Sequence, residues 1–212
     1  MQFPKRHSLP VLLLAASVCA KAQATITFDN VTTQAHAIIP EGYSGFDWSN
    51  FYVASPALLG PPYNTCGYEN GLISGQYIAF NGYANPSELS TVGNTDSIFG
   101  LTGYFTAAWT SDDQLTIEGL VNNKVVQSFV YELSETKPQF LKIHFSQDVS
   151  EIEFVTFSPT TYSSQMVLDN LTLNPKSATP EPESLLALGL GIGGFARLRR
   201  SHATERRLPP RG

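Results

Sequence analysis

Apolar and polar residues alternate through the middle of the chain, the period-two pattern of half-buried β-strands. Leu115 and Ile117, for example, alternate with Thr116 and Glu118. The pair Asn122-Asn123 that follows tolerates left-handed backbone and predicts a hairpin turn. No stretch before residue 184 shows a sustained helical period. The pattern predicts nine or ten strands: Thr25–Phe28, Phe46–Val53, Gln76–Asn81, Glu88–Val92, Gly103–Trp109, Gln114–Val121, Lys124–Leu133, Phe140–Phe145, Glu151–Phe157 and Gln165–Leu173.

Short strands punctuated by Gly, Pro and Asn favour an all-β fold, a β-sandwich over residues 25–175. We expect a jelly roll that resembles galactose-binding-like domains, with the first and last strands side by side because domain termini often lie together. The stretch Pro56–Tyr68 is rich in Pro, Gly and Asn and is predicted to be a long irregular loop, a type that often carries function.

The chain is 42% hydrophobic, enough to build a core, and only 15% charged. Its charge is unevenly distributed: between Thr25 and Ala178 four lysines stand against fifteen acidic residues, a net charge of −11. Such a domain repels nucleic acid and anionic membranes, so we exclude nucleic-acid binding and favour cations or neutral polymers as partners. Of the two cysteines, Cys19 lies in an export signal, which leaves Cys66 alone.

The N-terminus, residues 1–24, has the pattern of a secretory signal peptide, predicted to form a helix and to be read by the secretion translocon. Lys5 and Arg6 form a basic start, and Leu9–Val18 is apolar. Ala22 and Ala24 supply the small residues of a cleavage site. The apolar run is far shorter than the ~20 residues of a membrane span.

The C-terminus has three parts that follow one another closely. A linker at 176–183 contains Pro180, Glu181 and Pro182, and these prolines keep it extended. Residues 184–200 form a predicted short hydrophobic helix whose apolar part spans only ~18 Å, against a hydrocarbon core of ~30 Å. A basic tail at 201–212 follows. The helix ends in a basic cluster expected on the cytoplasmic side: Arg197, Arg199 and Arg200.

This Pro-Glu-Pro motif, apolar stretch and arginine cluster resemble the PEP-CTERM sorting tail, which is also catalogued under the name of ice-binding proteins that carry it. The resemblance implies processing by an exosortase, a membrane transpeptidase thought to cut near Pro-Glu-Pro. It implies an exported precursor tethered to the inner membrane, then a surface or matrix protein of biofilm-forming polysaccharide producers. The tail Ser201–Gly212 is longer than the family pattern. Pieces of the domain also resemble PEP-CTERM ectodomains without assigned activity: 26–29, 42–51, 74–82, 106–109 and 168–171.

Two carboxylates lie on the strands that we expect to be neighbours. Asp29 follows the first strand, and Asp169 with Asn170 lies in the last. Adjacent carboxylates repel unless a cation or proton intervenes, and Ca²⁺ prefers hard oxygen ligands. We therefore predict a structural calcium at Asp29, Asp169 and Asn170; the alternative is that Asp29 starts a turn and Asp169 caps a strand end.

Aromatic residues gather around the predicted loop and could stack on sugar rings. The candidates for carbohydrate contact are Trp48, Tyr52, Tyr63 and Tyr68. The alternative is that alternate aromatics such as Trp48 form the core.

The function that the sequence favours is a non-catalytic surface or matrix protein that binds exopolysaccharide. One alternative is a small secreted hydrolase acting on polysaccharide, which would need two carboxylates about 5–10 Å apart. Asp112-Asp113 and Glu118 offer carboxylates, but without a catalytic motif around them. The other alternative is a purely structural coat or adhesion component.

Overall fold

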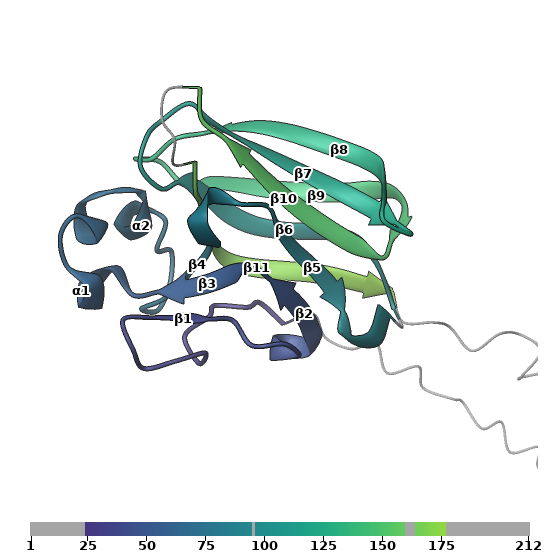
Figure 1. The fold of residues 1–212 in the computed structure, drawn as a ribbon, viewed down its shortest axis with the longest axis horizontal. Helices are drawn as coiled ribbons and strands as arrows, with labels where there is room; N and C mark the ends of the chain where they lie inside the picture. The colour runs from purple at the N-terminus through teal and green to yellow at the C-terminus, as the bar shows by residue number, and fades with distance from the viewer. Residues whose placement is uncertain (1–23, 95, 160–163, 177–212) are drawn as a thin grey trace, which may run out of the picture.

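The computed structural model describes residues 24–94, 96–159 and 164–176, and in these ranges the chain forms two antiparallel sheets packed face to face (Figure 1). The predicted β-sandwich is thus confirmed. The six-stranded sheet has the order β1 (His36–Ile38), β3 (Phe51–Ala54), β4 (Ile78–Asn81), β11 (Met166–Lys176), β6 (Ser97–Ala107), β9 (Gln139–Val149). The five-stranded sheet has the order β2 (Phe46–Ser49), β5 (Ser87–Thr91), β10 (Glu151–Phe157), β7 (Asp113–Val121), β8 (Lys124–Leu133).

Most connections between these strands carry the chain from one sheet to the other, as in a jelly roll. Among the described elements, only β3 to β4 and β7 to β8 join consecutive strands of the same sheet. The β7–β8 turn is the predicted hairpin, and both its central residues have positive φ (Asn122 52°, Asn123 59°). Because the chain crosses repeatedly between the sheets, residues distant in the sequence meet at one end of the sandwich.

The predicted single strand Phe46–Val53 is wrong, because the chain changes sheets at its middle. Asn50 has a φ of 56°, which Asn tolerates better than most residues, and the backbone turns there. Its side-chain amide donates to the carbonyls of Gly82 and Pro86 at 3.0 Å each, so the corner is held by the side chain of the residue that makes it. The alternation of apolar residues continues through the corner, which hid it from sequence reasoning.

The ends of the domain meet as predicted. Ile26 donates its amide to the carbonyl of Leu171 at 2.7 Å, and Leu171 returns the bond at 3.0 Å. The predicted strand Thr25–Phe28 is therefore reduced to this single bridge to β11. β1 was not predicted, because only three residues form it and its large apolar residue, Ile38, is exposed.

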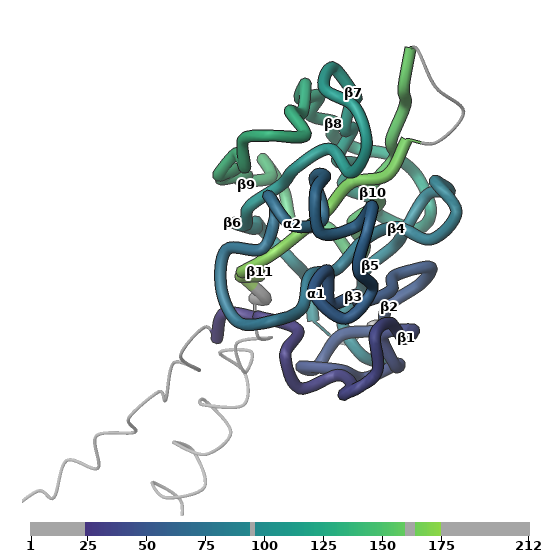
Figure 2. The backbone as a smooth tube through the Cα atoms, turned by 90° about the vertical axis from the view of Figure 1, so that its left-hand side faces the viewer, coloured from purple at the N-terminus to yellow at the C-terminus, as the bar shows by residue number. Residues whose placement is uncertain are grey.

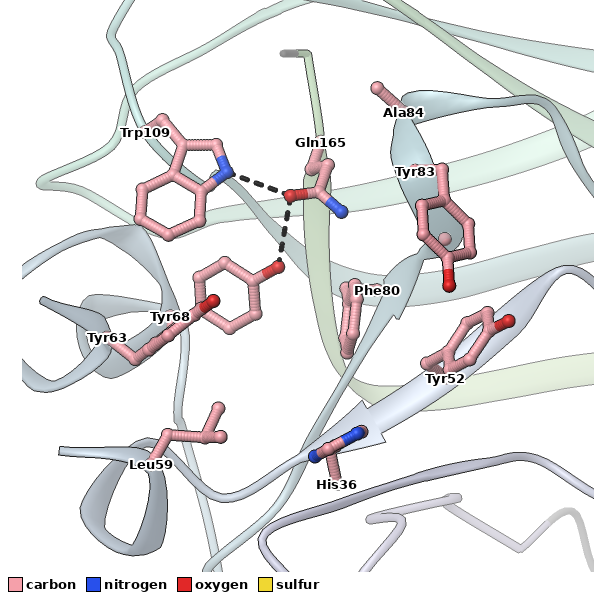
Figure 3. Close-up of a pocket in the computed structure, with 11 residues that line it drawn as sticks. His36, Tyr52, Leu59, Tyr63, Tyr68, Phe80, Tyr83, Ala84, Trp109 and Gln165 are labelled. Atoms are coloured by element: carbon pink, nitrogen blue, oxygen red, sulfur yellow. Dashed lines mark hydrogen bonds between the residues drawn. The ribbon is translucent and has the colours of Figure 1, made fainter.

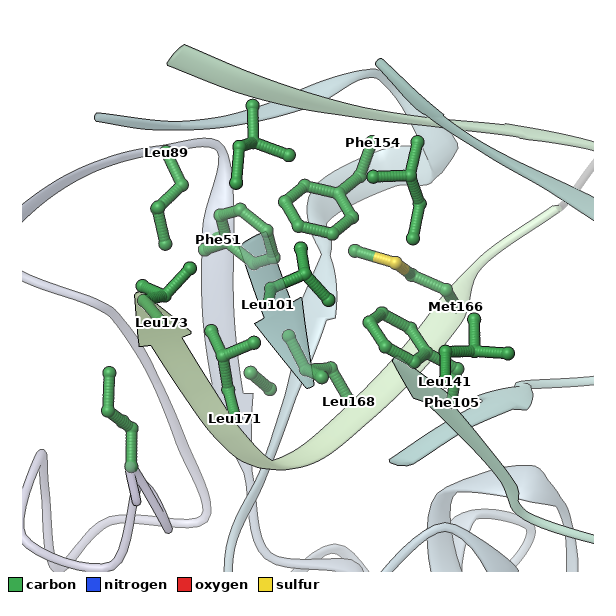
Figure 4. Close-up of a cluster of buried hydrophobic side chains, with 14 of the residues drawn as sticks. Phe51, Leu89, Leu101, Phe105, Leu141, Phe154, Met166, Leu168, Leu171 and Leu173 are labelled. Carbon is green, nitrogen blue, oxygen red and sulfur yellow. The ribbon is translucent and has the colours of Figure 1, made fainter. Parts of the chain in front are cut away.

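The main core lies between the two sheets (Figure 4). Fully buried aromatic side chains from opposite sheets meet there: Phe51 packs edge-on against Phe154 with ring centroids 5.5 Å apart. Phe105, also from the six-stranded sheet, stacks on Phe154. Burying large aromatic groups is the main term that stabilises such a sandwich.

A second, smaller core lies on the outer face of the six-stranded sheet. Successive strand residues point to opposite faces, so Val53 joins the main core while Ala54 faces outward, and Leu168 and Val167 divide in the same way. The chain between β3 and β4 covers this outer face with α1 (Pro56–Leu59), η2 (Tyr63–Thr65) and α2 (Gly67–Asn70).

The predicted irregular loop Pro56–Tyr68 is therefore wrong in detail: it is a set of short helical turns over a small apolar core. α1 and α2 lie together at one end of the molecule in Figure 1, and they face the viewer in Figure 2. Three further helical turns are η1 (Tyr43–Gly45), η3 (Gly82–Ala84) and η4 (Val92–Asn94).

Residues 1–23, nearly all of the predicted signal peptide, and residues 177–212 lie outside the described residues. The two predicted terminal helices, Ala22 and the motif at 180–182 and 197–200 lie there with them. In the part of the chain that the structure describes, none of the helices has the length and apolar character needed to cross a membrane.

Candidate functional site

A pocket of about 460 Å³ opens on the outer face of the six-stranded sheet, beside the inserted helical turns (Figure 3). Its floor is the cross-strand pair Tyr52 on β3 and Phe80 on β4, whose ring centroids are 5.7 Å apart. This volume lies in the range of small-molecule sites, about 300–1,000 Å³. We call it the aromatic pocket; its lining is His36, Tyr52, Leu59, Tyr63, Tyr68, Phe80, Gly82, Tyr83, Ala84, Trp109 and Gln165.

A glycine places the wall of the pocket that α2 contributes. Gly67 donates its amide to the carbonyl of Ala108 at 2.9 Å, so α2 lies directly against the end of β6. A Cβ at Gly67 would lie 1.7 Å from the carbonyl oxygen of Ala107, which no side chain allows. The close approach buries Tyr68, only 1% exposed, beneath the pocket.

Three aromatic rings pack against one another at this wall. Tyr63 meets Tyr68 edge-on at 5.2 Å and Trp109 at 5.4 Å between centroids, and Tyr68 lies 5.3 Å from Trp109. Tyr63 and Trp109 are half-buried, while Tyr68 is buried. These mutual contacts hold the partly exposed rings in fixed orientations, as a rigid stacking surface requires.

Gln165, the residue just before β11, fixes the polar edges of two of these rings. Its Oε1 accepts a hydrogen bond from the Trp109 indole N–H at 2.8 Å and one from the Tyr68 hydroxyl at 3.2 Å (Figure 3). Its Nε2 donates to the carbonyl of Asn81 at 3.0 Å. The amide group is thus used within the protein, and it turns the polar edge of Trp109 inward.

The lining is electrically neutral although the domain is strongly acidic. It contains no Asp, Glu, Lys or Arg; His36 is its only basic side chain. The Tyr68 pKa is raised above its ordinary value, chiefly because burial disfavours the phenolate, so this tyrosine is a neutral donor. Among the described residues, none hydrogen-bonds the hydroxyls of Tyr52, Tyr63 or Tyr83. The pocket therefore offers ring faces and neutral hydroxyls, which suit an uncharged ligand with apolar faces and polar edges.

The structure divides the sequence-predicted aromatic candidates into two groups. Tyr52, Tyr63 and Tyr68 meet in the aromatic pocket. Trp48 does not line it: it is 6% exposed, packs edge-on against Phe51 at 5.2 Å, and donates its indole N–H to the carbonyl of Tyr43 at 2.9 Å. It belongs to the main core, because its side of β2 faces the opposite sheet.

Sequence reasoning missed Phe80, Tyr83, Trp109 and Gln165 as pocket residues. Trp109 ends a predicted strand and so carried a weak signal, since aromatic residues at strand ends often face loops. Nothing in the local sequence marks Gln165. It lies in the pocket only because β11 pairs between β4 and β6.

The three predicted calcium ligands meet around one bend, residues 73–76, and each accepts a hydrogen bond from it. Asp169 is fully buried; its Oδ2 accepts the amides of Ile73 at 2.8 Å and Ser74 at 2.9 Å, and its Oδ1 accepts its neighbour's amide. Asp29 Oδ1 accepts the amide of Gln76 at 2.6 Å. Asn170 Oδ1 accepts the hydroxyl of Ser74 at 2.7 Å. Asp29 lies in a turn, as the alternative expected, but Asp169 does not cap a strand end: from within β11 it accepts the amides of the bend at residues 73–74.

In the described ranges no group of three or more His, Cys, Asp or Glu is placed to hold a metal, so a calcium ion at Asp29, Asp169 and Asn170 stays a prediction. Its ligands would be the lone pairs that the amides leave free. Ca²⁺ at ten times its Kd would then stabilise the fold by about 1.4 kcal/mol. We expect the midpoint of thermal unfolding to rise by a few degrees in millimolar Ca²⁺ relative to chelator. Identical melting curves in calcium and in chelator would remove the ion from the site.

A row of glutamates crosses the outer face of the five-stranded sheet. Glu153 on β10 is paired directly with Glu88 on β5 and with Glu118 on β7. Burial raises the pKa of Glu153, and the negative charges of Glu88 and Glu118 raise it further. Like charges directly opposite on neighbouring strands destabilise a sheet.

We therefore expect Glu153→Gln to raise the free energy of unfolding by about 1 kcal/mol at low ionic strength. The gain should shrink in 1 M salt, because salt screens the repulsion. Urea unfolding of the full-length chain at low and at high salt measures the gain and its salt dependence. Glu41 is an exposed loop glutamate, and Glu41→Gln is the control that should leave the free energy of unfolding unchanged at either salt concentration. A loss of stability in Glu153→Gln would mean that the row is held by contacts other than charge.

Comparison with known proteins gives a family match at the C-terminus. Residues 178–200 match the family model described as the PEP-CTERM protein-sorting motif, which covers the predicted Pro-Glu-Pro segment, apolar stretch and arginines. The resemblance inferred from the sequence is confirmed, and the motif marks the chain as an exported protein with a membrane-anchored precursor that is sorted through its C-terminus. No curated protein matches the chain.

Several solved structures are similar to the chain at low identity. One is the CBM61 module described in complex with β-1,4-galactotriose (10% identity, TM-score 0.38, covering 65% of this chain and 95% of that one). Another is the CBM22-1 xylan-binding domain from Paenibacillus barcinonensis Xyn10C (16% identity, TM-score 0.42, covering 76% of this chain and 99% of that one). A third is the K2 cleaved adhesin domain of Lys-gingipain (10% identity, TM-score 0.44, covering 72% of this chain and 99% of that one).

Proposed function

We propose that this chain, which carries the PEP-CTERM protein-sorting motif, is a non-catalytic cell-surface or matrix protein whose β-sandwich binds a neutral extracellular polysaccharide in the aromatic pocket. One observation carries the proposal: a neutral cavity of about 460 Å³ lined by six aromatic rings, with tyrosine hydroxyls that no described residue hydrogen-bonds. Sugar rings have apolar faces that stack on aromatic side chains and hydroxyls that hydrogen-bond at their edges.

The charge of the domain supports a neutral ligand. The middle of the chain carries a net charge of −11, which repels anionic polymers, yet the pocket lining contributes no negative charge. A polysaccharide without uronate, sulfate or phosphate groups can reach the pocket without that repulsion. Stacking and neutral hydrogen bonds also depend little on salt, unlike binding that rests on ion pairs.

Affinity gel electrophoresis of the full-length chain tests the proposal, with soluble xylan, galactan and hydroxyethylcellulose as neutral polymers and alginate as an anionic one. At least one neutral polymer should retard the protein, equally at low and at high salt, and alginate should not. Retardation by none of the neutral polymers would overturn the proposed function.

The same samples test the absence of catalysis. The pocket lining has no carboxylate to act as acid, base or nucleophile on a glycosidic bond. We expect no release of reducing ends from the polymer that binds. Their steady release, proportional to protein concentration, would favour the hydrolase alternative.

We further propose that an exosortase processes the tail at the Pro-Glu-Pro segment after the secretion translocon has exported the chain. Replacing Glu181 by alanine in the producing cell should leave uncut precursor in the membrane fraction. Normal maturation of this variant would show that the cut does not depend on the motif.

A further inference from the structure

The aromatic rings of the pocket form a row rather than a single platform. Starting from Trp109, successive ring centroids lie 5.3 Å apart to Tyr68, 5.3 Å on to Phe80, 5.7 Å on to Tyr52 and 6.1 Å on to Tyr83. Figure 3 shows the row running across the pocket, with Trp109 at one end and Tyr83 at the other. Tyr68 is buried and links the row from beneath, and the other four rings are partly or largely exposed; this row is longer than one sugar ring can cover.

Tyr83 ends this row and is 82% exposed, although it lies on the same small surface as buried Tyr68. It stands edge-on to Tyr52, at 89° between ring planes. A side chain that stays this exposed adds little to the free energy of folding, since most of its apolar area remains in water. Its position is therefore not explained by core packing.

The backbone that carries Tyr83 is held in a costly conformation. Tyr83 and Ala84 have φ values of 54° and 57°, a left-handed region that costs about 1–2 kcal/mol per residue for side chains other than Gly. Gly82 before them has no Cβ, which would otherwise lie 2.4 Å from a Tyr52 ring carbon. The missing Cβ thus lets the backbone at Gly82 pack directly against the Tyr52 ring, next to Tyr83.

The side chains of two asparagines hydrogen-bond the backbone of this turn, and we call this set of bonds the clamp. Asn50 Nδ2 donates to the carbonyls of Gly82 at 3.0 Å, Asn85 at 3.3 Å and Pro86 at 3.0 Å. Asn81 Nδ2 adds a bond to the carbonyl of Asn85 at 3.1 Å. Such strain persists only where surrounding bonds over-determine it, and it is concentrated at functional sites. The clamp preorganises an exposed ring at the far end of the row.

We propose that the aromatic pocket binds several successive sugar units of one neutral polysaccharide chain, and that Tyr83 on its clamped turn is the outermost contact and sets the length of chain recognised. The inference rests on the proposed function and narrows it, from a polysaccharide to a stretch of chain spanning the row from Trp109 to Tyr83. Asn50 is a positioning residue that acts through the Tyr83 turn.

Calorimetric titration of the full-length chain with xylo-, galacto- and cello-oligosaccharides, each from the disaccharide to the hexasaccharide, tests this inference. In the series that binds, affinity should rise at least about tenfold from the shortest to the longest member and then level off. Tyr83→Ala should weaken binding of the longest member about tenfold and leave the shortest unchanged, and Tyr83→Phe, which keeps the ring and loses only the hydroxyl, should lose less than Tyr83→Ala. Phe140→Ala removes another exposed aromatic, 54% exposed and outside the pocket, and is the matched control that should change nothing.

Asn50→Gly separates positioning from contact, because glycine keeps the positive φ at this corner and removes the amide. It should weaken binding of the longest oligosaccharide alone, and the amide of Asn85, which donates to the Gly82 carbonyl at 3.0 Å, should exchange hydrogen faster. Equal affinity across all lengths, or an equal loss at every length in Tyr83→Ala, would overturn the inference and leave the proposed function standing. Failure of every neutral oligosaccharide and polymer to bind would overturn both.

Discussion

Trp109→Ala is expected to weaken binding of the neutral polysaccharide about 30-fold, the largest effect of any single change in the pocket. Truncating a large, well-packed aromatic anchor of a binding site typically costs 2 kcal/mol or more, which is about 30-fold in Kd. Trp109 is such an anchor: Tyr63 and Tyr68 pack on its ring, and Gln165 holds its indole N–H. Affinity electrophoresis in a gel containing the polymer that retards the unaltered chain measures the loss.

Fluorescence makes this prediction independent of folding defects, because the chain has only two tryptophans. Trp48 is buried in the main core and Trp109 lines the pocket. In Trp48→Phe, the remaining Trp109 emission should shift when the polysaccharide is added. In Trp109→Phe, the remaining Trp48 emission should stay constant. A response from Trp48 alone would place the ligand away from the aromatic pocket.

The β-sandwich was predictable because strand alternation depends on nearest neighbours in the sequence. Leu115 and Ile117 face the core and Thr116 faces outward, as their polarity indicates. The meeting of Ile26 with Leu171 also followed, since terminal strands of a domain tend to be adjacent. The corner at Asn50 could not be found in this way. The apolar pattern continues through it, and only the backbone dihedral separates β2 from β3.

The pocket was also predictable only where its residues are neighbours in the sequence. Tyr52, Tyr63 and Tyr68 lie within one segment of the sequence, so a cluster of aromatics pointed to them. Trp109 and Gln165 reach the pocket from β6 and β11, and only the order of strands in the sheet brings them together. Trp48 shows the converse: it lies close to Tyr52 in the sequence but faces the opposite sheet.

The second large effect concerns pH: the domain is expected to be more stable at pH 5 than at pH 7.5 when calcium is absent. Among the described residues, the carboxyl groups with a displaced pKa all have it displaced upward, chiefly by burial: Asp113, Glu151, Glu153 and Asp169. A carboxyl whose pKa is higher in the folded than in the unfolded state binds its proton more tightly when folded. Its stabilising effect is complete below the unfolded pKa and is lost as the pH rises through the folded pKa.

Asp169 should dominate this dependence. Burial and the nearby charge of Asp29 raise its pKa from 3.8 to about 6, against the opposing effect of three amide donors. After allowance for solvent screening, the shift corresponds to roughly 2 kcal/mol lost between about pH 4 and pH 7. Urea unfolding of the full-length chain in chelator at a series of pH values measures it. Asp169→Asn removes the ionisation and should flatten the curve, whereas Glu41→Gln should leave it as in the unaltered chain.

The same measurement with calcium reverses the dependence if the ion binds. A divalent cation stabilises the ionised pair Asp29 and Asp169, so protons and calcium compete for it. Stability in calcium should then rise from pH 5 to pH 7.5, while in chelator it falls. Parallel curves that both fall toward pH 7.5 would show a turn capped by aspartates without an ion. A fall in stability from pH 7.5 to pH 5 in chelator would show that the amides of Ile73 and Ser74 outweigh burial at Asp169.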